Sequence, residues 1–236
     1  MAEAKNKKKK VGIAIGIGAG VLVSIGILAS IGRKKTVEEN KNYKKDILKN
    51  KNDKFNFKKM TPQEFIAFLS PSVKVISQKY GIPYKFMMAQ MALETGWGKS
   101  ELFYKYFNVG GIRSFHPEKE ANTLAWTHEV VLPADLPKWD KWERNKAKDV
   151  KVIKNGVEYV NISVKLPFRT FPGLVEGLTY YLNNVLLNKY FKPYIAEANG
   201  DADKYVDLLQ SGKYGAKYAT ALNYPATIKG LFHNFV

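Results

Sequence analysis

The chain has 236 residues, enough for one domain of ordinary size with appendages. It contains no cysteine, which excludes disulfides, thiolate catalysis and cysteine-based zinc sites. Its three histidines, His116, His128 and His233, lack the spacing of a metal-binding motif, so the sequence predicts neither a metal nor a cofactor.

The formal charge of +17 is concentrated toward the N-terminus. Residues 1–60 hold 16 Lys and Arg against 5 Asp and Glu, whereas the remainder holds 22 against 16. A basic tail suits anionic lipid or an anionic wall polymer. Nucleic acid is not an expected partner, because the sequence shows no helix-turn-helix, zinc finger or RNA-binding aromatic motif.

Residues 11–32 contain no charge and no proline, and they follow a basic tail at residues 1–10. An apolar stretch of this length can cross a bilayer core of about 30 Å as a helix. We therefore expect a transmembrane anchor that contacts the lipid bilayer. A cleaved signal peptide is the alternative, although its apolar region is typically about 7–15 residues long.

Small residues recur at every fourth position within this span, at Gly12, Gly16, Gly20 and Ser24. The spacing lets two helices approach closely, so self-association in the membrane is one interpretation. A glycine-rich span without pairing is the other. Lysines and arginines flank the span on both sides, so the positive-inside rule leaves its orientation open.

A Lys- and Asn-rich segment at residues 33–60 lacks apolar periodicity, which predicts a flexible, self-repelling linker. The folded domain is expected over residues 61–236. It begins with Thr61 as helix N-cap and Glu64 as its capping-box partner. The helical pattern runs to Leu69, resumes after Pro71 and ends at Tyr80 and Gly81.

The rest of the domain changes periodicity twice. A helix follows Pro83, and alternating segments at 123–131 and 150–170 then predict strands. Asn155-Gly156 lies between two alternating runs, which predicts a hairpin with a type I′ turn. Helical patterns return at residues 173–187, 201–210 and 224–232. This order indicates an α+β fold, with a small β lobe beside a mainly helical body.

Glu94 is the only acid in the apolar stretch MMAQMALET, residues 87–95. Met87, Met91 and Glu94 share one helix face. A carboxyl group among apolar neighbours keeps its proton, because ionisation away from water is costly, and the negative end of the helix dipole acts in the same direction. Such a group can protonate a leaving glycosidic oxygen. A solvated acid at a helix end is the alternative. Trp97, in the following turn, either walls the site or packs beneath it.

The segment AQMALETGWGKS, residues 89–100, closely resembles the signature AQ-ALESGWG-S of glycoside hydrolase family 73, the bacterial N-acetylglucosaminidases. That family includes cell-wall autolysins and the hydrolase part of flagellar-rod assembly proteins. Further segments resemble the family in the same order: FNVGGIR at 107–113, AWTHE at 125–129, FRTFPGLVEGLTYYLNNVL at 168–186 and YATALNYPATI at 218–228. The resemblance implies a lysozyme-like fold with a cleft between the helical body and the β lobe.

The resemblance implies that Glu94 is the general acid and that Glu129 is the second catalytic carboxylate. The second carboxylate would orient or activate water, or steady a positively charged sugar, and the substrate's own acetamido group would assist. The distance between the two carboxylates distinguishes retention, at about 5–5.5 Å, from inversion, at about 6.5–9.5 Å.

Four further positions lie in the segments that resemble the family, and two of them, Tyr218 and Tyr224, match positions near its cleft. Tyr218 and Tyr224 are candidates for hydrogen bonds to the sugar or the acid, with core packing as the alternative. Asn108 and Arg113 are expected to shape the base of the lobe, and both are candidate substrate-binding residues. Arg113 is also a candidate for contact with a carboxylate of the substrate.

The sequence departs from the family directly after Glu129, in a long charged insertion at residues 130–149. Asp135 or Asp140 within it is an alternative second carboxylate. Trp139 and Trp142 either stack on sugar rings or pack the insertion, and packing is the favoured interpretation.

Together these observations predict a membrane-anchored, bacteriolytic peptidoglycan hydrolase of the N-acetylglucosaminidase type, with its catalytic domain facing the cell wall. A muramidase or lytic transglycosylase of lysozyme-like fold is one alternative. A phage lysin, anchored in the membrane of a virion, is an alternative origin. A non-catalytic wall-binding or assembly protein is the non-enzymatic alternative.

Overall fold

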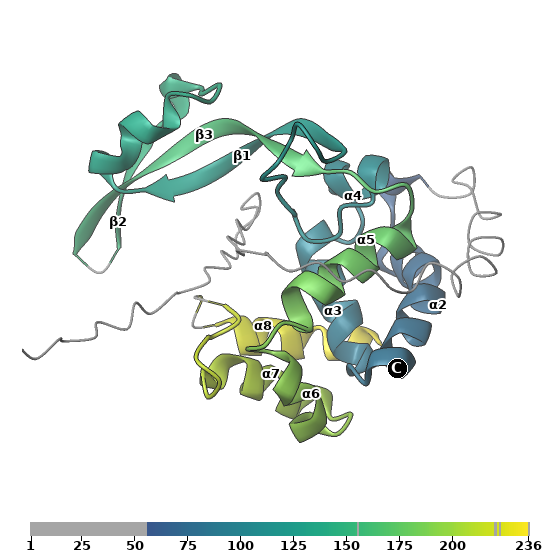
Figure 1. Cartoon of the computed structure of the whole chain (residues 1–236). Coiled ribbons are helices and arrows are strands. Elements are labelled where there is room, and N and C mark those ends of the chain that lie inside the picture. Colours follow the sequence, from purple (N-terminus) through teal and green to yellow (C-terminus); the bar gives the residue numbers. More distant parts are fainter. Residues whose placement is uncertain (1–55, 155, 220, 222, 236) are drawn as a thin grey trace, which may run out of the picture.

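A computed structural model describes residues 56–154, 156–219, 221 and 223–235. Helices form a body, and a three-stranded sheet extends from its side as a separate lobe (Figure 1). This arrangement confirms the predicted α+β fold with a small β lobe. Within the described residues, no helix is long and apolar enough to cross a membrane. The expected anchor at residues 11–32 and the basic tail at 1–10 lie outside them.

The first long helix, α2, spans Pro62–Tyr80 and begins with the predicted capping box. The Glu64 N–H donates to Thr61 Oγ1 at 3.2 Å, and the Thr61 N–H donates to Glu64 Oε2 at 2.8 Å. The predicted interruption at Pro71 is wrong, because the helix continues through it. Leu69 and Val73, on either side of Pro71, are fully buried, and this packing holds the helix together where proline removes one backbone hydrogen bond.

Packing begins before Thr61, within the segment that the sequence assigns to the linker. A short 3-10 turn, η1, spans Phe57–Lys59. Phe57 and Met60 are buried in the main apolar cluster, and the Phe57 ring meets the Phe68 ring edge-on at 5.2 Å. These residues therefore belong to the folded body.

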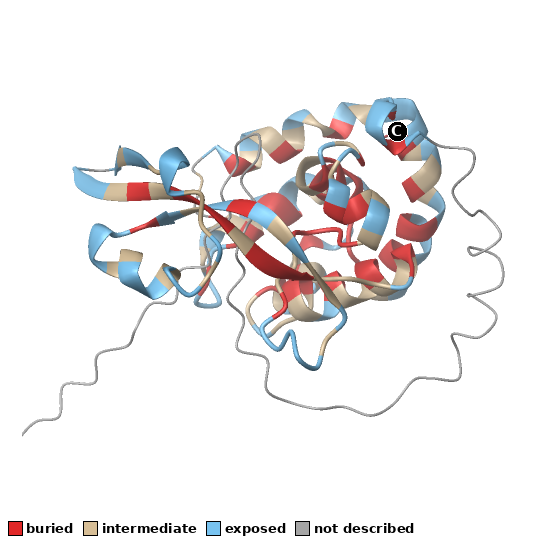
Figure 2. Cartoon of the chain, turned by 90° about the horizontal axis from the view of Figure 1, so that it is seen from above, coloured by how far each residue is buried: buried red, intermediate tan, exposed pale blue. Residues whose placement is uncertain are grey.

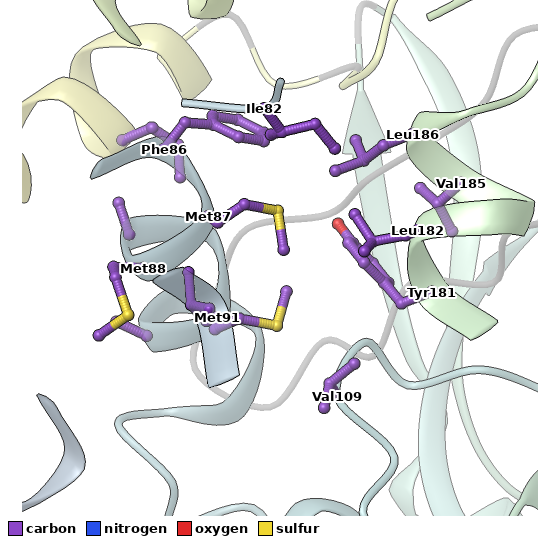
Figure 3. Close-up of a cluster of buried hydrophobic side chains, with 14 of the residues drawn as sticks. Ile82, Phe86, Met87, Met88, Met91, Val109, Tyr181, Leu182, Val185 and Leu186 are labelled. Atoms are coloured by element: carbon purple, nitrogen blue, oxygen red, sulfur yellow. The ribbon is translucent and has the colours of Figure 1, made fainter. Parts of the chain in front are cut away.

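Helix α3, Tyr84–Thr95, lies at the centre of the body. It packs against α2, α7 (Ala202–Ser211) and α8 (Tyr224–Gly230). Because it is enclosed on several sides, its residues from Phe86 to Ala92 are all buried. Figure 3 shows Met87 and Met91 pointing from α3 toward Tyr181, at the end of α5 (Leu174–Tyr181). The apolar stripe beneath Glu94 is thus part of the core.

The remaining helices complete the body around α3. Helix α5 continues into a π-helical turn, η4, at Leu182–Leu186. The sequence patterns had not indicated two short helices: α4 at Glu101–Tyr106 and α6 at Lys192–Ala198. A final 3-10 turn, η5, spans Phe232–Asn234.

The lobe is an antiparallel sheet in the order β1-β3-β2. Its strands are β1 at Asn122–Val131, β2 at Val150–Lys154 and β3 at Val157–Arg169. Lys154 pairs with Val157 across a two-residue connection, and Gly156 has a φ of 77°. The predicted hairpin is therefore confirmed, and glycine supplies the left-handed conformation that its turn requires.

The insertion after β1 folds back onto the sheet through two 3-10 segments, η2 at Pro133–Trp139 and η3 at Lys146–Lys148. Much of β3 is buried (Figure 2). Trp139 and Trp142 pack, partly buried, against the second apolar cluster, which contains Ile162, Val164 and Leu166 of β3. Both tryptophans therefore pack the insertion against the sheet, as favoured, while part of each ring stays exposed.

Candidate active site

Glu94 is the last but one residue of α3 and lies where the helix meets the molecular surface. The residue is half-buried, so it keeps some contact with solvent while most of its surroundings are protein. This burial raises the pKa of the carboxyl group to about 8, and a hydrogen bond from Gln90 lowers it in part. The apolar stripe had predicted a raised pKa. At neutral pH the carboxyl group therefore carries a proton.

The chain leaves α3 through a left-handed turn. Gly96 has a φ of 57° and Trp97 a φ of 58°, and the Trp97 N–H donates to the carbonyl of Ala92 at 2.9 Å. The Gly98 N–H donates to Thr95 Oγ1 at 2.9 Å. These bonds satisfy backbone groups at the helix end and fix the position at which α3 presents Glu94.

A buried glutamine, Gln90, holds the carboxyl group from one helical turn below. Its Nε2 donates to Glu94 Oε1 at 2.8 Å and to the Tyr218 hydroxyl at 2.9 Å. Its Oε1 accepts a hydrogen bond from the Tyr224 hydroxyl at 2.7 Å. Both donors and the acceptor of the amide are therefore used, which fixes its orientation.

Three tyrosines form the buried part of the same network, on the side away from Glu94. Tyr218 and Tyr224 are buried, with ring centroids 5.4 Å apart. The Tyr218 hydroxyl also lies 2.5 Å from the hydroxyl of Tyr181. Burial raises the pKa of Tyr181, Tyr218 and Tyr224 well above the ordinary value, so all three hydroxyls stay protonated. The structure thus brings Tyr218 and Tyr224 to Glu94 through Gln90.

This network favours one of the two carboxyl oxygens as the site of the proton. Oε1 of Glu94 accepts the hydrogen bond from Gln90, which favours Oε2 as the oxygen that carries the proton of the acid form. The sequence analysis did not assign a role to Gln90. Its signal was a single amide four residues before Glu94, on the same face of an otherwise apolar helix.

Trp97 packs beneath the turn. Its ring meets Phe65 edge-on at 5.7 Å and stacks with Phe235 at 5.9 Å. The ring therefore ties the end of α3 to α2 and to the C-terminal segment. Of the two interpretations of Trp97, these contacts favour packing.

Asn108 organises the loop that leads into the lobe. Its Nδ2 donates to the carbonyls of Ile112 at 2.8 Å and Arg169 at 2.9 Å. Its Oδ1 accepts from the Ile112 N–H at 2.7 Å. The side chain joins the loop to the end of β3, so it shapes the base of the lobe as expected.

Glu129 lies on β1, on the strand face that also carries the buried Thr127 and Val131. It is half-buried and pairs in register with Ile162 of β3. It lies seven positions after Asn122, which corresponds to about 23 Å along the strand from the base of the lobe. The two candidate carboxylates therefore come from different parts of the molecule, Glu94 from the body and Glu129 from the lobe.

Arg113 belongs to the same lobe as Glu129. Burial lowers the pKa of the guanidinium group, and the nearby charge of Glu129 raises it. The guanidinium carbon lies 5.8 Å from the centroid of the Phe115 ring, and residue 113 bridges to Phe168 of β3. Arg113 is thus within electrostatic reach of the second candidate carboxylate.

The alternative carboxylates of the insertion are held in ion pairs. Asp135 accepts from Lys138 at 2.5 Å, and Asp140 accepts from Arg144 at 2.8 Å. Arg144 also donates to Asp149 at 2.5 Å, and its own side chain is 5% exposed. These pairs organise the insertion, which makes Glu129 the better candidate for the second carboxylate. Across the part of the chain that the structure covers, no three acidic or histidine side chains cluster to hold a metal ion.

A helical body with a small sheet lobe, and a hydrogen-bonded glutamic acid with a raised pKa at a helix end, are features that acid-assisted glycoside hydrolases require. The sequence model of the glucosaminidase family, described as mannosyl-glycoprotein endo-beta-N-acetylglucosaminidase, matches residues 70–235, and the chain belongs to this family. The match confirms the resemblance to family 73.

Two relatives illustrate the similarity. The peptidoglycan hydrolase FlgJ of Salmonella typhimurium is 25% identical over 166 residues, which cover 69% of this chain and 42% of that protein. The chain thus spans less than half of the length of FlgJ. The catalytic domain of the autolysin Auto from Listeria monocytogenes has a similar fold, with a TM-score of 0.52 and 21% identity over 86% of this chain and 97% of that domain. The glycoside hydrolase domain of FlgJ aligns with a TM-score of 0.47 and 23% identity over 74% of this chain and 87% of that domain.

Proposed function

We propose that this protein hydrolyses the β-1,4 glycosidic bonds of peptidoglycan strands as an N-acetylglucosaminidase. Its family supports the reaction type, and the relative FlgJ, which is named a peptidoglycan hydrolase, supports the substrate. The observation that carries the proposal is the hydrogen bond from Gln90 to a Glu94 carboxyl group whose pKa is about 8. That arrangement keeps a proton available at the end of α3.

In the proposed reaction Glu94 acts as the general acid. Its Oε2 proton passes to the glycosidic oxygen as the bond from that oxygen to the anomeric carbon breaks, and the leaving sugar departs as a neutral alcohol. Positive charge develops on the anomeric carbon and the ring oxygen. The resulting Glu94 carboxylate keeps the Gln90 hydrogen bond, which stabilises the charged form.

Glu129 is the proposed second carboxylate. A water molecule supplies the new oxygen on the anomeric carbon, and Glu129 either takes a proton from that water or steadies the positively charged sugar. The match of AWTHE at 125–129 to the family, and the half-buried position of Glu129 on β1, support this role. The substrate's acetamido oxygen is the alternative partner for the anomeric carbon.

Zymography of the full chain on purified peptidoglycan tests this proposal. Wild type is expected to clear the substrate, and Glu94→Gln to lose at least about 100-fold in rate, because an amide cannot donate the proton. Glu129→Gln tests the second carboxylate. Glu143→Gln, a lobe variant whose parent residue forms an exposed ion pair with Lys165 at 3.2 Å, is the matched control. Clearing by Glu94→Gln at the wild-type rate would refute the assignment.

Mass spectrometry of the products identifies the bond that is cut. A new reducing end on N-acetylglucosamine supports the proposal. The location of the two carboxylates on separate parts of the molecule favours a second candidate, a muramidase or lytic transglycosylase that works with Glu94 alone. That candidate predicts a muramic acid or anhydro end and little effect of Glu129→Gln. A non-catalytic wall protein predicts binding without products.

We also propose that residues 11–32 anchor the protein in a membrane, with the catalytic domain facing the cell wall or, in a phage, the host wall. The uncharged composition of the span and the basic residues on both sides support this proposal. Membrane pelleting of the full chain is the test, with Ile15→Asp as a variant that interrupts the span. Gly16→Leu tests self-association by cross-linking, because a large side chain would separate paired helices.

A further inference from the structure

The lobe contains a cavity that has no part in the reaction steps proposed for Glu94 and Glu129. A cavity of about 420 Å³ lies between the loop after Arg113 and the insertion. Its volume is within the range of small-molecule binding pockets, which is about 300–1,000 Å³. The lining residues are Arg113, Ser114, Phe115, Pro117, Lys138, Trp139, Lys141 and Trp142.

The lining combines aromatic rings with cations. Phe115, Trp139 and Trp142 supply rings, and Phe115 is 51% exposed although it is a large apolar side chain. Aromatic rings next to a few polar groups are typical of sites that bind one face of an amphipathic ligand such as a sugar. An exposed phenylalanine at the edge of a pocket has surface available for such contact.

The two lysines that line the cavity, Lys138 and Lys141, differ in whether they already form an ion pair. Lys138 bonds to Asp135 at 2.5 Å. Lys141 forms no ion pair with any residue that the structure describes, and its Nζ lies 5.7 Å from the centroid of the Trp142 ring. Lys141 is exposed, so its charge is available to an anionic ligand. A carboxylate placed against Trp142 would meet this ammonium group.

The insertion is held in a fixed shape before any ligand binds. Arg144, with a side chain 5% exposed, bonds to Asp140 at 2.8 Å and to Asp149 at 2.5 Å. Trp139 and Trp142 pack on the apolar cluster of the sheet. A preformed pocket loses less conformational entropy on binding, which favours affinity.

We propose that this pocket binds the carboxylate-bearing part of the glycan strand, that is, the lactyl group and stem peptide of a muramic acid unit. This inference rests on the proposed function. Arg113 connects the pocket to the candidate site, because it lines the cavity and interacts electrostatically with Glu129. A strand held there by its acidic substituent lies along the lobe next to Glu129. The pocket thus selects strands that retain their stem peptides over bare or neutral glycans.

Binding measurements on the full chain test this inference separately from hydrolysis. The Glu94→Gln background prevents turnover, and tryptophan fluorescence reports binding of a soluble disaccharide peptide prepared from peptidoglycan. Lys141→Gln is expected to weaken its binding about 3- to 10-fold, the loss of one charge-assisted contact at an exposed site. Lys148→Gln, the same change on the same insertion but outside the pocket, is the matched control. An uncharged N-acetylglucosamine oligomer is the second ligand, and Lys141→Gln is expected to leave its affinity unchanged.

Equal weakening by Lys141→Gln and Lys148→Gln would overturn the inference, as would equal affinity for the peptide-bearing and uncharged glycans. The disaccharide peptide could instead be displaced by polyphosphate and not by an N-acetylated stem peptide with free carboxylates. That result would show that the pocket binds a phosphate polymer. If selective binding is found while wild type releases no sugar products, the proposed function fails and the pocket assignment stands.

Discussion

Nε2 of Gln90 lies 2.8 Å from Oε1 of Glu94, and both side chains come from one face of α3. The rigid helix therefore fixes the catalytic candidate and its partner relative to each other. The tyrosines from the C-terminal part of the chain then fix Gln90. Two opposing effects act on the acid: burial raises its pKa to about 8, and the amide hydrogen bond limits that rise.

Replacing Gln90 by leucine is expected to alter the pH dependence of hydrolysis. Without the hydrogen bond that lowers it, the pKa of Glu94 rises further above 8, so the alkaline limb of kcat/KM moves to higher pH. The maximal rate falls about 10- to 100-fold, because the carboxyl group loses its fixed orientation. A pH–rate profile of wild type and Gln90→Leu gives both quantities.

Gln90→Glu provides a comparison for the same position. A second carboxyl group beside Glu94 raises the pKa of Glu94 through like-charge repulsion. The alkaline limb of kcat/KM then also moves to higher pH. If the limb of Gln90→Leu stays at the wild-type pH while only the rate falls, the hydrogen bond does not influence the titration of Glu94, and Gln90 has a purely structural role.

Glu94→Gln is expected to make the protein more stable at alkaline pH. The folded-state pKa of Glu94, about 8, lies above the ordinary value of 4.5, so between these pH values the folded state holds a proton that the unfolded state releases. Wild-type stability therefore falls as pH rises from about 4.5 to about 8. The variant avoids this loss, which we expect to be about 1–3 kcal/mol, since Glu94 keeps some solvent contact.

Thermal unfolding at pH 4 and pH 9 measures this difference. Wild type and Glu94→Gln are expected to unfold at similar temperatures at pH 4, where the acid is protonated in both states. At pH 9 the melting temperature of Glu94→Gln is expected to exceed that of wild type by several degrees. Equal melting temperatures at pH 9 would show that Glu94 titrates near its ordinary value, which would remove the physical basis of its role as acid.

Local signals in the sequence were sufficient for the parts of the fold that local chemistry determines. The Thr61–Glu64 capping box and the Asn155-Gly156 hairpin depend on residues within a few positions of each other, and both are confirmed. Pro71 misled the prediction because a local helix breaker was outweighed by packing of its neighbours in the core. Propensity alone does not contain that tertiary contribution.

The site was partly visible in the sequence for the same reason. Glu94 could be identified as the only acid in an apolar helical stretch, and the family resemblance indicated Tyr218 and Tyr224. Their connection through Gln90 spans 128 and 134 positions of the chain, which no periodicity reports. The pocket in the lobe was also hidden, because it forms only when the insertion folds back toward the loop after Arg113.

Gly177→Ala is expected to be strongly destabilising. A Cβ at this position of α5 would overlap the carbonyl oxygen of Phe107. This oxygen belongs to the backbone, so it cannot move aside as the end of a flexible side chain could. The helix and the loop that leads to the lobe must then separate, at a cost of at least about 2 kcal/mol. Urea unfolding measures the change.

Gly230→Ala is the matched control, because a Cβ there meets no atom within 4 Å. Its position at the end of α8 tolerates alanine, and the variant is expected to be neutral or up to about 1 kcal/mol more stable. Comparable destabilisation by both variants would show that helix geometry, rather than the approach of α5 to Phe107, determines the result.

Two buried tyrosines provide a test of the network's energetic value. The Tyr218 hydroxyl bonds to Gln90 and Tyr181, so Tyr218→Phe leaves buried partners unsatisfied and is expected to cost about 1–2 kcal/mol. The Tyr205 hydroxyl is buried and has no hydrogen-bond partner among the described residues. Tyr205→Phe keeps the edge-on ring contact with Phe86 at 4.8 Å and is expected to be neutral or stabilising by up to about 1 kcal/mol.

Denaturant unfolding of both phenylalanine variants at neutral pH distinguishes the two environments, because the chemical change is identical. Tyr218→Phe should also slow hydrolysis, since the freed Gln90 amide holds Glu94 less firmly, whereas Tyr205→Phe should not. If the two variants lose the same stability and the same activity, the hydrogen bonds of Tyr218 contribute nothing beyond the burial of its ring. The orientation of Glu94 would then depend on the packing of α3 alone.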